Sequence, residues 1–341
     1  MQISASDLPL RDAVLATVVY ADLFNFPLDR AEIHRDLIGV AAGRAETERT
    51  IAALVATGAL AQIDELLTLP GRAALAAQRR ERRAHAAHLW PRARRFGRAL
   101  ARFPFVRMVA VSGSLAAEHP DRRADIDYLI VTTPGRLWLV RGLAVLLVRL
   151  ARTGGAHLCP NYLLTTRALT LQERDLYTAH ELLQAAPPAG TPIYRRFLSE
   201  NNWAAAWMPN RFQGATAAPD LPAEVGILGR FGEATLGGAL GDRLERWEAA
   251  RKRRRLGANG QAAHFTDDVC AGHYGHHRRR VLREFEARCL RAGGAAAFVA
   301  PLAREAGEPA EPAALAAPPG PHPLAAEAHL RPAMMAPERA K

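Results

Sequence analysis

Two aspartates separated by a single residue, Asp125 and Asp127, stand at the start of the apolar run 128–131. On a β-strand, side chains at positions i and i+2 point to the same face, so this spacing predicts two carboxylates side by side. Neighbouring carboxylates repel each other unless a cation lies between them, and such oxygen ligands suit Mg²⁺ or Mn²⁺. The pair therefore predicts a divalent-cation site. The alternative is that both aspartates cap a turn and stay in solvent.

A glycine–serine pair, Gly113-Ser114, lies upstream of the aspartates and directly follows the apolar run 109–111. A turn of this kind offers backbone N–H groups and a hydroxyl to a phosphate, especially where it opens a helix. A metal site next to a phosphate-binding turn is typical of enzymes that catalyse phosphoryl or nucleotidyl transfer.

The combination of Gly113-Ser114 with Asp125-x-Asp127 between two apolar strands resembles the signature of the polymerase-β-type nucleotidyltransferase superfamily. Its order of strand, Gly-Ser, helix, aspartate strand, helix and strand can be followed through residues 105–166. The resemblance implies an α/β core with a mixed sheet, as in prokaryotic nucleotidyltransferase-domain proteins. It implies transfer of a nucleoside monophosphate from an NTP to a hydroxyl. Asp125 and Asp127 would be the catalytic metal ligands, and Gly113 and Ser114 would bind the nucleotide.

Members of this superfamily usually carry a third carboxylate on a neighbouring strand. In the next expected strand, residues 157–164, the position where this acid would stand is Asn161. An amide oxygen can bind a metal ion, but an amide cannot act as a base at neutral pH. Either Glu181 or Glu200 takes this role, or the metal site is reduced.

Composition and charge limit the possible partners and the cellular location of the protein. The chain has 341 residues, 49% of them hydrophobic, and a formal net charge of +11. This charge fits an acidic partner such as a nucleotide, a nucleic acid or an acidic protein, and it fits equally well solvated arginine-rich helices without such a partner. Three cysteines are too few for a disulfide framework. The longest apolar stretch, 137–151, contains two arginines and is too short to span a bilayer, and no signal peptide is recognisable at the N-terminus. We therefore expect a cytoplasmic protein without a membrane partner.

The pattern along the chain predicts several regions. Residues 1–70 resemble a winged helix, with helices over 13–23, 29–37 and 46–57 and strands over 60–63 and 66–69, of which the second helix opens on a capping box at Asp29 and Glu32. A helical connector interrupted at Pro91 is expected over 71–104, the nucleotidyltransferase core over 105–210, and a helical C-terminal region over 220–300. The Ala/Pro-rich tail 307–341 has the composition of a disordered segment.

Two further segments leave alternatives open. The aromatic residues of 194–207 could clamp a nucleotide base, or they belong to the core. Cys270, His273 and His276 could gather round a metal, although two neighbouring glycines argue against a rigid helix there.

Three functions follow from these residues. The first is Mg²⁺-dependent nucleotidyl transfer to a protein, a tRNA or a small molecule. The second is a catalytically reduced relative that binds a nucleotide or a protein partner, which Asn161 favours. The third is a nucleic-acid-binding regulator that uses the N-terminal unit and the basic run 251–255.

Overall fold

The computed structural model describes residues 8–217, 221, 225–257, 264–271 and 275–291. The tail predicted over 307–341 and His273 of the proposed metal cluster lie outside the described residues.

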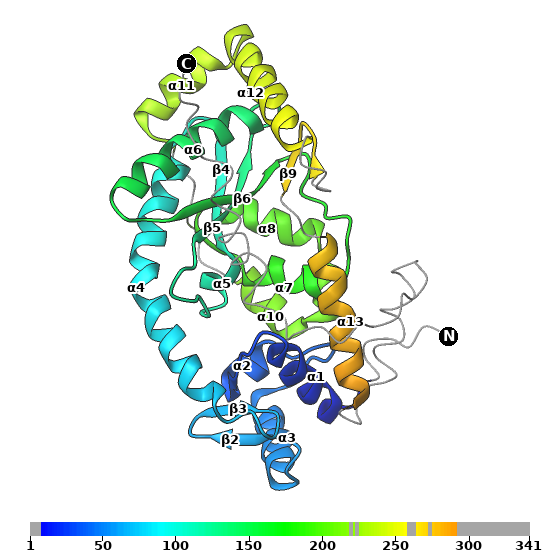
Figure 1. Cartoon of the computed structure of the whole chain (residues 1–341). Coiled ribbons are helices and arrows are strands. Elements are labelled where there is room, and N and C mark those ends of the chain that lie inside the picture. Colours follow the sequence, from blue (N-terminus) through cyan, green and yellow to red (C-terminus); the bar gives the residue numbers. More distant parts are fainter. Residues whose placement is uncertain (1–7, 218–220, 222–224, 258–263, 272–274, 292–341) are drawn as a thin grey trace.

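The N-terminal unit consists of three helices and a small antiparallel sheet, drawn in blue in Figure 1. The predicted capping box is present: Asp29 accepts a hydrogen bond from the backbone of Glu32, and the Glu32 side chain accepts one from the backbone of Asp29. The three predicted helices and the hairpin are confirmed within a few residues, and a short strand before the second helix completes the sheet in the order β1-β3-β2. The elements are α1 (Leu10–Asp22), β1 (Leu28–Asp29), α2 (Arg30–Arg35), α3 (Arg44–Ala56), β2 (Ala61–Ile63) and β3 (Leu66–Thr68).

A single long helix, α4 (Leu75–Ala101), leads from this unit to the central sheet (Figure 1). The sequence predicted an interruption at Pro91, and this was wrong, because the helix continues through the proline. Proline removes one backbone hydrogen bond from a helix interior. Buried residues on both sides of it, among them Ala86, Ala93 and Leu100, pack into the core of the sheet and hold the helix together.

The central sheet has six strands in the order β7-β4-β5-β6-β9-β8. Only the β5–β6 pair is parallel, and the other four pairs are antiparallel, so the sheet is mixed and the predicted α/β class is confirmed at this level. The strands are β4 (Val106–Ser112), β5 (Ile126–Thr132), β6 (Leu158–Thr165), β7 (Ala186–Ala189), β8 (His264–Phe265) and β9 (Val269–Ala271).

Helices cover both faces of this sheet (Figure 1). On one face Ile126, Tyr128 and Ile130 pack against α4, α6 (Leu137–Thr153) and α12 (Ala239–Gly257). On the other face a second cluster joins Val131 to α7 (Leu176–Gln184), α8 (Thr191–Glu200) and α13 (Gly275–Arg291). Residues of α1 belong to this second cluster, so the N-terminal unit shares a core with the sheet.

Local sequence signals explain several of these elements. Helix α7 begins at Leu176, because Asp175 caps it by accepting a hydrogen bond from the Thr178 backbone. The prolines that follow α7 form β7, which is an edge strand, where a missing N–H is tolerated. Tyr194 and Phe197 are buried core residues, which favours the structural interpretation of their segment.

After the short α9 (Ala204–Trp207), the chain forms the helix α10 (Pro209–Thr216). The C-terminal region has the expected helices, including α11 (Ile227–Leu236), but it also supplies β8 and β9 to the sheet. Within the described part of the chain, no helix combines the length and apolar character needed to cross a bilayer.

Candidate functional site

The candidate site lies where β4 ends beside the start of β5. These strands are antiparallel, and Ser112, the last residue of β4, is the register partner of Asp127. Directly opposite residues in such a pair have Cβ atoms about 5 Å apart. The Gly-Ser turn that follows Ser112 is therefore held next to Asp127, as the sequence predicted.

The turn depends on Gly113, which has a φ of 67° and opens the four-residue helix α5 (Gly113–Ala116). This left-handed conformation strains residues that have a Cβ, so glycine allows the chain to leave the strand abruptly. Ser114 follows and is only 2% exposed. Its hydroxyl oxygen is buried and has no hydrogen-bond partner among the residues that the structure describes.

The two aspartates differ in position. Asp127 lies within β5 and is 1% exposed, whereas Asp125 lies just before the strand, which begins at Ile126. Strand alternation therefore places Asp127 but does not by itself place Asp125, and the expected strand position of Asp125 was wrong by one residue. Asp125 is also buried, and its carboxylate lies 4.0 Å from Nδ1 of the exposed His157 at the start of the neighbouring strand.

The residue across from Asp127 on β6 is Cys159, and Asn161, where the sequence places a third acid, lies two residues further along the strand. The register shifts along this pair, so that Tyr128 faces Pro160 while Leu129 faces Tyr162. Asn161 is therefore the extra residue of a β-bulge. It is buried, and it is not the register partner of Asp127.

The other candidates for a third carboxylate have different surroundings. Glu200 forms an ion pair of 2.7 Å with Arg196 and accepts a hydrogen bond from Thr170. Glu181 accepts a hydrogen bond from Gln184 one turn later on α7. Among the described residues, no three His, Cys, Asp or Glu side chains are grouped so that they could hold a metal ion together. The site thus offers two carboxylates.

Asp125 also lines a cleft of about 500 Å³, which we call the arginine cleft. Its charged lining comes from α4, from the segment before β5, and from the end of α6 with the loop that follows it. The residues that give it its character are Arg92, Arg122, Arg123 and Arg152, together with His85 and His157. A carboxylate of the candidate site therefore borders a strongly basic surface.

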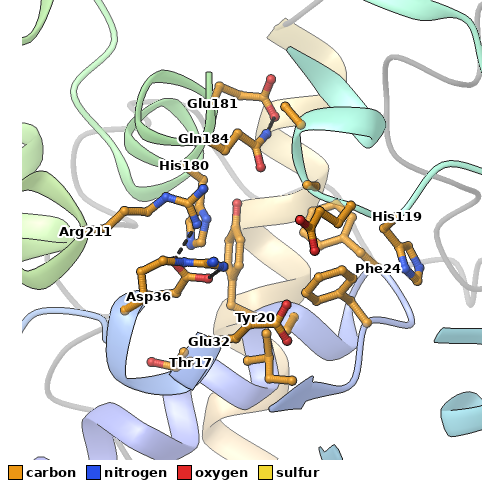
Figure 2. A pocket seen from close by; sticks show the side chains of 17 residues that line it. Thr17, Tyr20, Phe24, Glu32, Asp36, His119, His180, Glu181, Gln184 and Arg211 are labelled. Atoms are coloured by element: carbon orange, nitrogen blue, oxygen red, sulfur yellow. Dashed lines mark hydrogen bonds and ion pairs between the residues drawn. The ribbon is translucent and has the colours of Figure 1, made fainter. Parts of the chain in front are cut away.

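A second cavity, of about 120 Å³, lies at the other end of α5, between the N-terminal unit, α7 and α10. Figure 2 shows Tyr20 in its middle, with Asp36, Arg211 and His180 on one side and His119 on the other. The rings of Tyr20 and His180 are stacked with centroids 4.2 Å apart. Burial raises the pKa of Tyr20 well above its usual value, and the charges of Glu181 and Asp175 add to this rise.

The main charged residues of this cavity are matched by partners. Asp36 pairs with Arg211 at 2.5 Å and with Arg35 at 2.7 Å. Burial alone would raise the pKa of Asp36, but the two guanidinium groups outweigh it and hold that pKa below its usual range. Glu32 is matched by Arg79 at 2.7 Å. These contacts join the N-terminal unit to the helices behind the sheet, so we assign the cavity a structural role.

Sequence reasoning identified Gly113, Ser114 and Asp127 with their correct relation, but it missed Cys159 and the cleft. Cys159 could have been found only from the register of β5 and β6, which the sequence does not reveal. Arg122 and Arg123 do carry a signal, because they directly precede the aspartate motif.

No protein-family model, curated protein or solved structure matches the chain. The resemblance to nucleotidyltransferases therefore depends on the residues of the motif and on their geometry.

Proposed function

We propose that the chain is a nucleotidyltransferase-fold enzyme that transfers a nucleoside monophosphate from an NTP to a hydroxyl acceptor. The observation that supports this most is the pairing of Ser112 with Asp127, which sets the turn at Gly113 beside a buried carboxylate. In the reaction, the acceptor oxygen bonds to the α-phosphorus and its proton passes to water. The bond from the α-phosphorus to the bridging oxygen of the β-phosphate breaks, and pyrophosphate leaves.

The residues present fit a magnesium ion. Mg²⁺ is usually held by one or two carboxylates, with water and substrate phosphates completing its six oxygen ligands. Asp125 and Asp127 supply that number, and both are buried. A metal ion bound there would offset negative charge on the phosphates. The hydroxyl of Ser114 would donate a hydrogen bond to a phosphate oxygen, which gives this buried group a partner.

The remaining parts of the chain fit the same proposal. The core of β4, β5 and β6 with α5 and α6 would form the nucleotidyltransferase unit, and the three helices with their hairpin would form the winged-helix-like unit. No residue of the described chain completes a cluster of three metal ligands. This favours a second candidate function, in which the protein binds an NTP without transferring it.

The test is to incubate the protein with each NTP and Mg²⁺ or Mn²⁺ and to measure both NTP binding and pyrophosphate release. Cell extract and α-labelled NTP would reveal the acceptor. We expect Asp127→Asn and Asp125→Asn to reduce release by about 100-fold or more, as is typical for groups that stabilise charge in a transition state. The matched control is Asp64→Asn, at an exposed hairpin position whose φ of 54° suits asparagine.

The outcomes separate the candidates. Release that depends on Asp127 supports transfer, whereas binding without release in the wild-type protein supports the second function. Release that persists in Asp127→Asn, or the absence of both binding and release, would overturn the proposal.

A further inference from the structure

The arginine cleft has a strong excess of positive charge. Of the described residues that line it, Asp125 is the only carboxylate, against four arginines. Arg122 is 83% exposed and pairs with Glu81 at the surface, which is a weak interaction in water. Arg92 and Arg123 are exposed and form no ion pair with any described residue. The charge in the cleft is therefore available to an anionic ligand.

The basic surface continues beyond the cleft on two helices. On α4, His85, Leu89 and Arg92 follow one another at helical spacing along the cleft wall, and the half-buried Arg82 lies one turn before His85, near the carboxylates of Asp121 and Glu81. On α6, the exposed Arg149 lies one turn before Arg152. A compact triphosphate would occupy only part of this surface, whereas a longer chain of phosphates would follow it.

The lining of the cleft also argues against recognition of nucleobases. It contains no Phe, Tyr or Trp ring among its described residues, so it has few stacking partners for a nucleobase. Its volume of about 500 Å³ is that of a small-molecule site, which is room for a short stretch of one strand. The chemistry therefore matches the phosphodiester backbone of a single strand, bound without regard to sequence.

We infer that the acceptor is a single-stranded nucleic acid whose backbone lies in the arginine cleft and whose terminal hydroxyl reaches Asp125. This inference rests on the proposed function, because it supplies that reaction with its acceptor. The position of Asp125 carries the argument, since this carboxylate of the candidate site itself lines the cleft, whereas Gly113, Ser114 and Asp127 do not.

The test is fluorescence anisotropy of labelled single-stranded 12-mers of A and of U, titrated with the full chain between 50 and 300 mM salt. Four phosphate contacts would give a slope of log affinity against log salt of about −2.8, because single strands contribute about −0.7 per contact. The double variant Arg92→Gln/Arg123→Gln should reduce the slope to about −1.4 and weaken binding about tenfold at 100 mM salt.

The matched control is Arg49→Gln, an exposed arginine of α3 in the N-terminal unit, which should bind like the wild type. An equal loss in this control, or binding that is insensitive to the double variant, would overturn the inference. Displacement of the strand by equimolar Mg·ATP would overturn it as well, because the cleft would then hold the triphosphate. Equal binding of poly-glutamate would show an acidic protein site and would have the same consequence.

Catalysis gives a separate readout. If the strand is the acceptor, the double variant should raise its KM and leave kcat unchanged, because the cleft contributes to binding in both the ground and transition states. Strand binding that survives in a protein without NTP turnover would overturn the proposed function, while NTP turnover without strand binding would overturn this inference alone.

Discussion

Arg211 on α10 and Asp36 in the N-terminal unit, 175 residues apart in the chain, form a buried ion pair of 2.5 Å (Figure 2). Arg35 pairs with the same carboxylate, so that two guanidinium groups share one acid. The pair lies at the junction between the N-terminal unit and the helices that back the sheet. It therefore couples the stability of the two parts.

The first prediction concerns this ion pair. Asp36→Asn should lower the free energy of unfolding by about 3 kcal/mol at pH 7, because removal of one member leaves buried charge without its partner. Denaturant unfolding measures this loss. Asp64→Asn, which breaks an exposed pair with Arg80, should cost under about 1 kcal/mol and serves as the control.

The same pair predicts a dependence on pH. The folded protein holds the pKa of Asp36 below its ordinary value, so the ionised carboxylate stabilises the fold above its unfolded pKa of about 3.9. This stabilisation is lost as the pH falls from about 4 toward the folded pKa. The difference in unfolding free energy between the wild type and Asp36→Asn should therefore shrink below pH 4. A difference that stays constant from pH 7 to pH 3 would contradict the prediction.

Replacement of Ser114 by alanine should affect protein stability and NTP binding differently. Its buried hydroxyl has no hydrogen-bond partner among the described residues, so Ser114→Ala should leave the unfolding free energy unchanged or raise it by up to about 1 kcal/mol. The loss of a hydrogen bond to a phosphate should weaken NTP binding about tenfold. Ser199→Ala, on the exposed side of α8, should change neither quantity. Calorimetric titration with Mg·ATP and thermal unfolding provide the two measurements.

Glu245 on α12 caps a helix that lacks a side-chain cap of its own. Its carboxylate accepts hydrogen bonds from the backbone N–H groups of Trp138 at 2.9 Å and Leu139 at 2.7 Å, in the first turn of α6. Glu245→Ala should destabilise the protein by about 2 kcal/mol, and Glu245→Gln by about half as much, because the amide keeps one acceptor oxygen. An equal loss in both variants in denaturant unfolding would contradict this assignment.

Two glycines with similar backbone angles allow a matched comparison. Gly190 has a φ of 86°, and a Cβ there would lie 2.5 Å from the Arg107 carbonyl oxygen. Gly155 has a φ of 73° and open space around it. Gly155→Ala should cost about 1 kcal/mol from backbone strain, and Gly190→Ala about 3 kcal/mol, because an overlap with β4 is added. Similar thermal unfolding temperatures for the two variants would show that β4 and α8 can separate without loss.

The parts of the fold that the sequence predicted well are those with a strong local signal. The strands β4 and β5 are apolar runs bounded by Gly113 and the aspartates. The capping box marks the start of α2. The helix through Pro91 was missed because packing against the sheet outweighs a local cost of about 3 kcal/mol. The strands β8 and β9 were missed because segments of two and three residues carry too little periodicity to be recognised.

The candidate site likewise combines features that a local sequence pattern predicts with features that only the tertiary structure determines. The relation of Gly113 and Ser114 to Asp127 follows from one turn between two neighbouring strands, which a local pattern can encode. Cys159 stands opposite Asp127 only because of the parallel register of β6, and Asn161 was displaced by a bulge. The arginine cleft combines side chains from α4, α6 and two loops, so only the tertiary structure brings them together.

The pairing of β9 with β6 has a practical consequence for shortened forms of the protein. Residues 269–271 cover the outer edge of β6 at Tyr162, Leu163 and Leu164. A chain that stopped before them would leave the N–H and C=O groups on this edge of the apolar strand β6 unpaired. A strand of a second molecule could then pair with this edge and cause aggregation. Attempts to isolate the half that contains the central sheet should therefore retain the segment 264–271, even though it lies about 100 residues after β6 in the sequence.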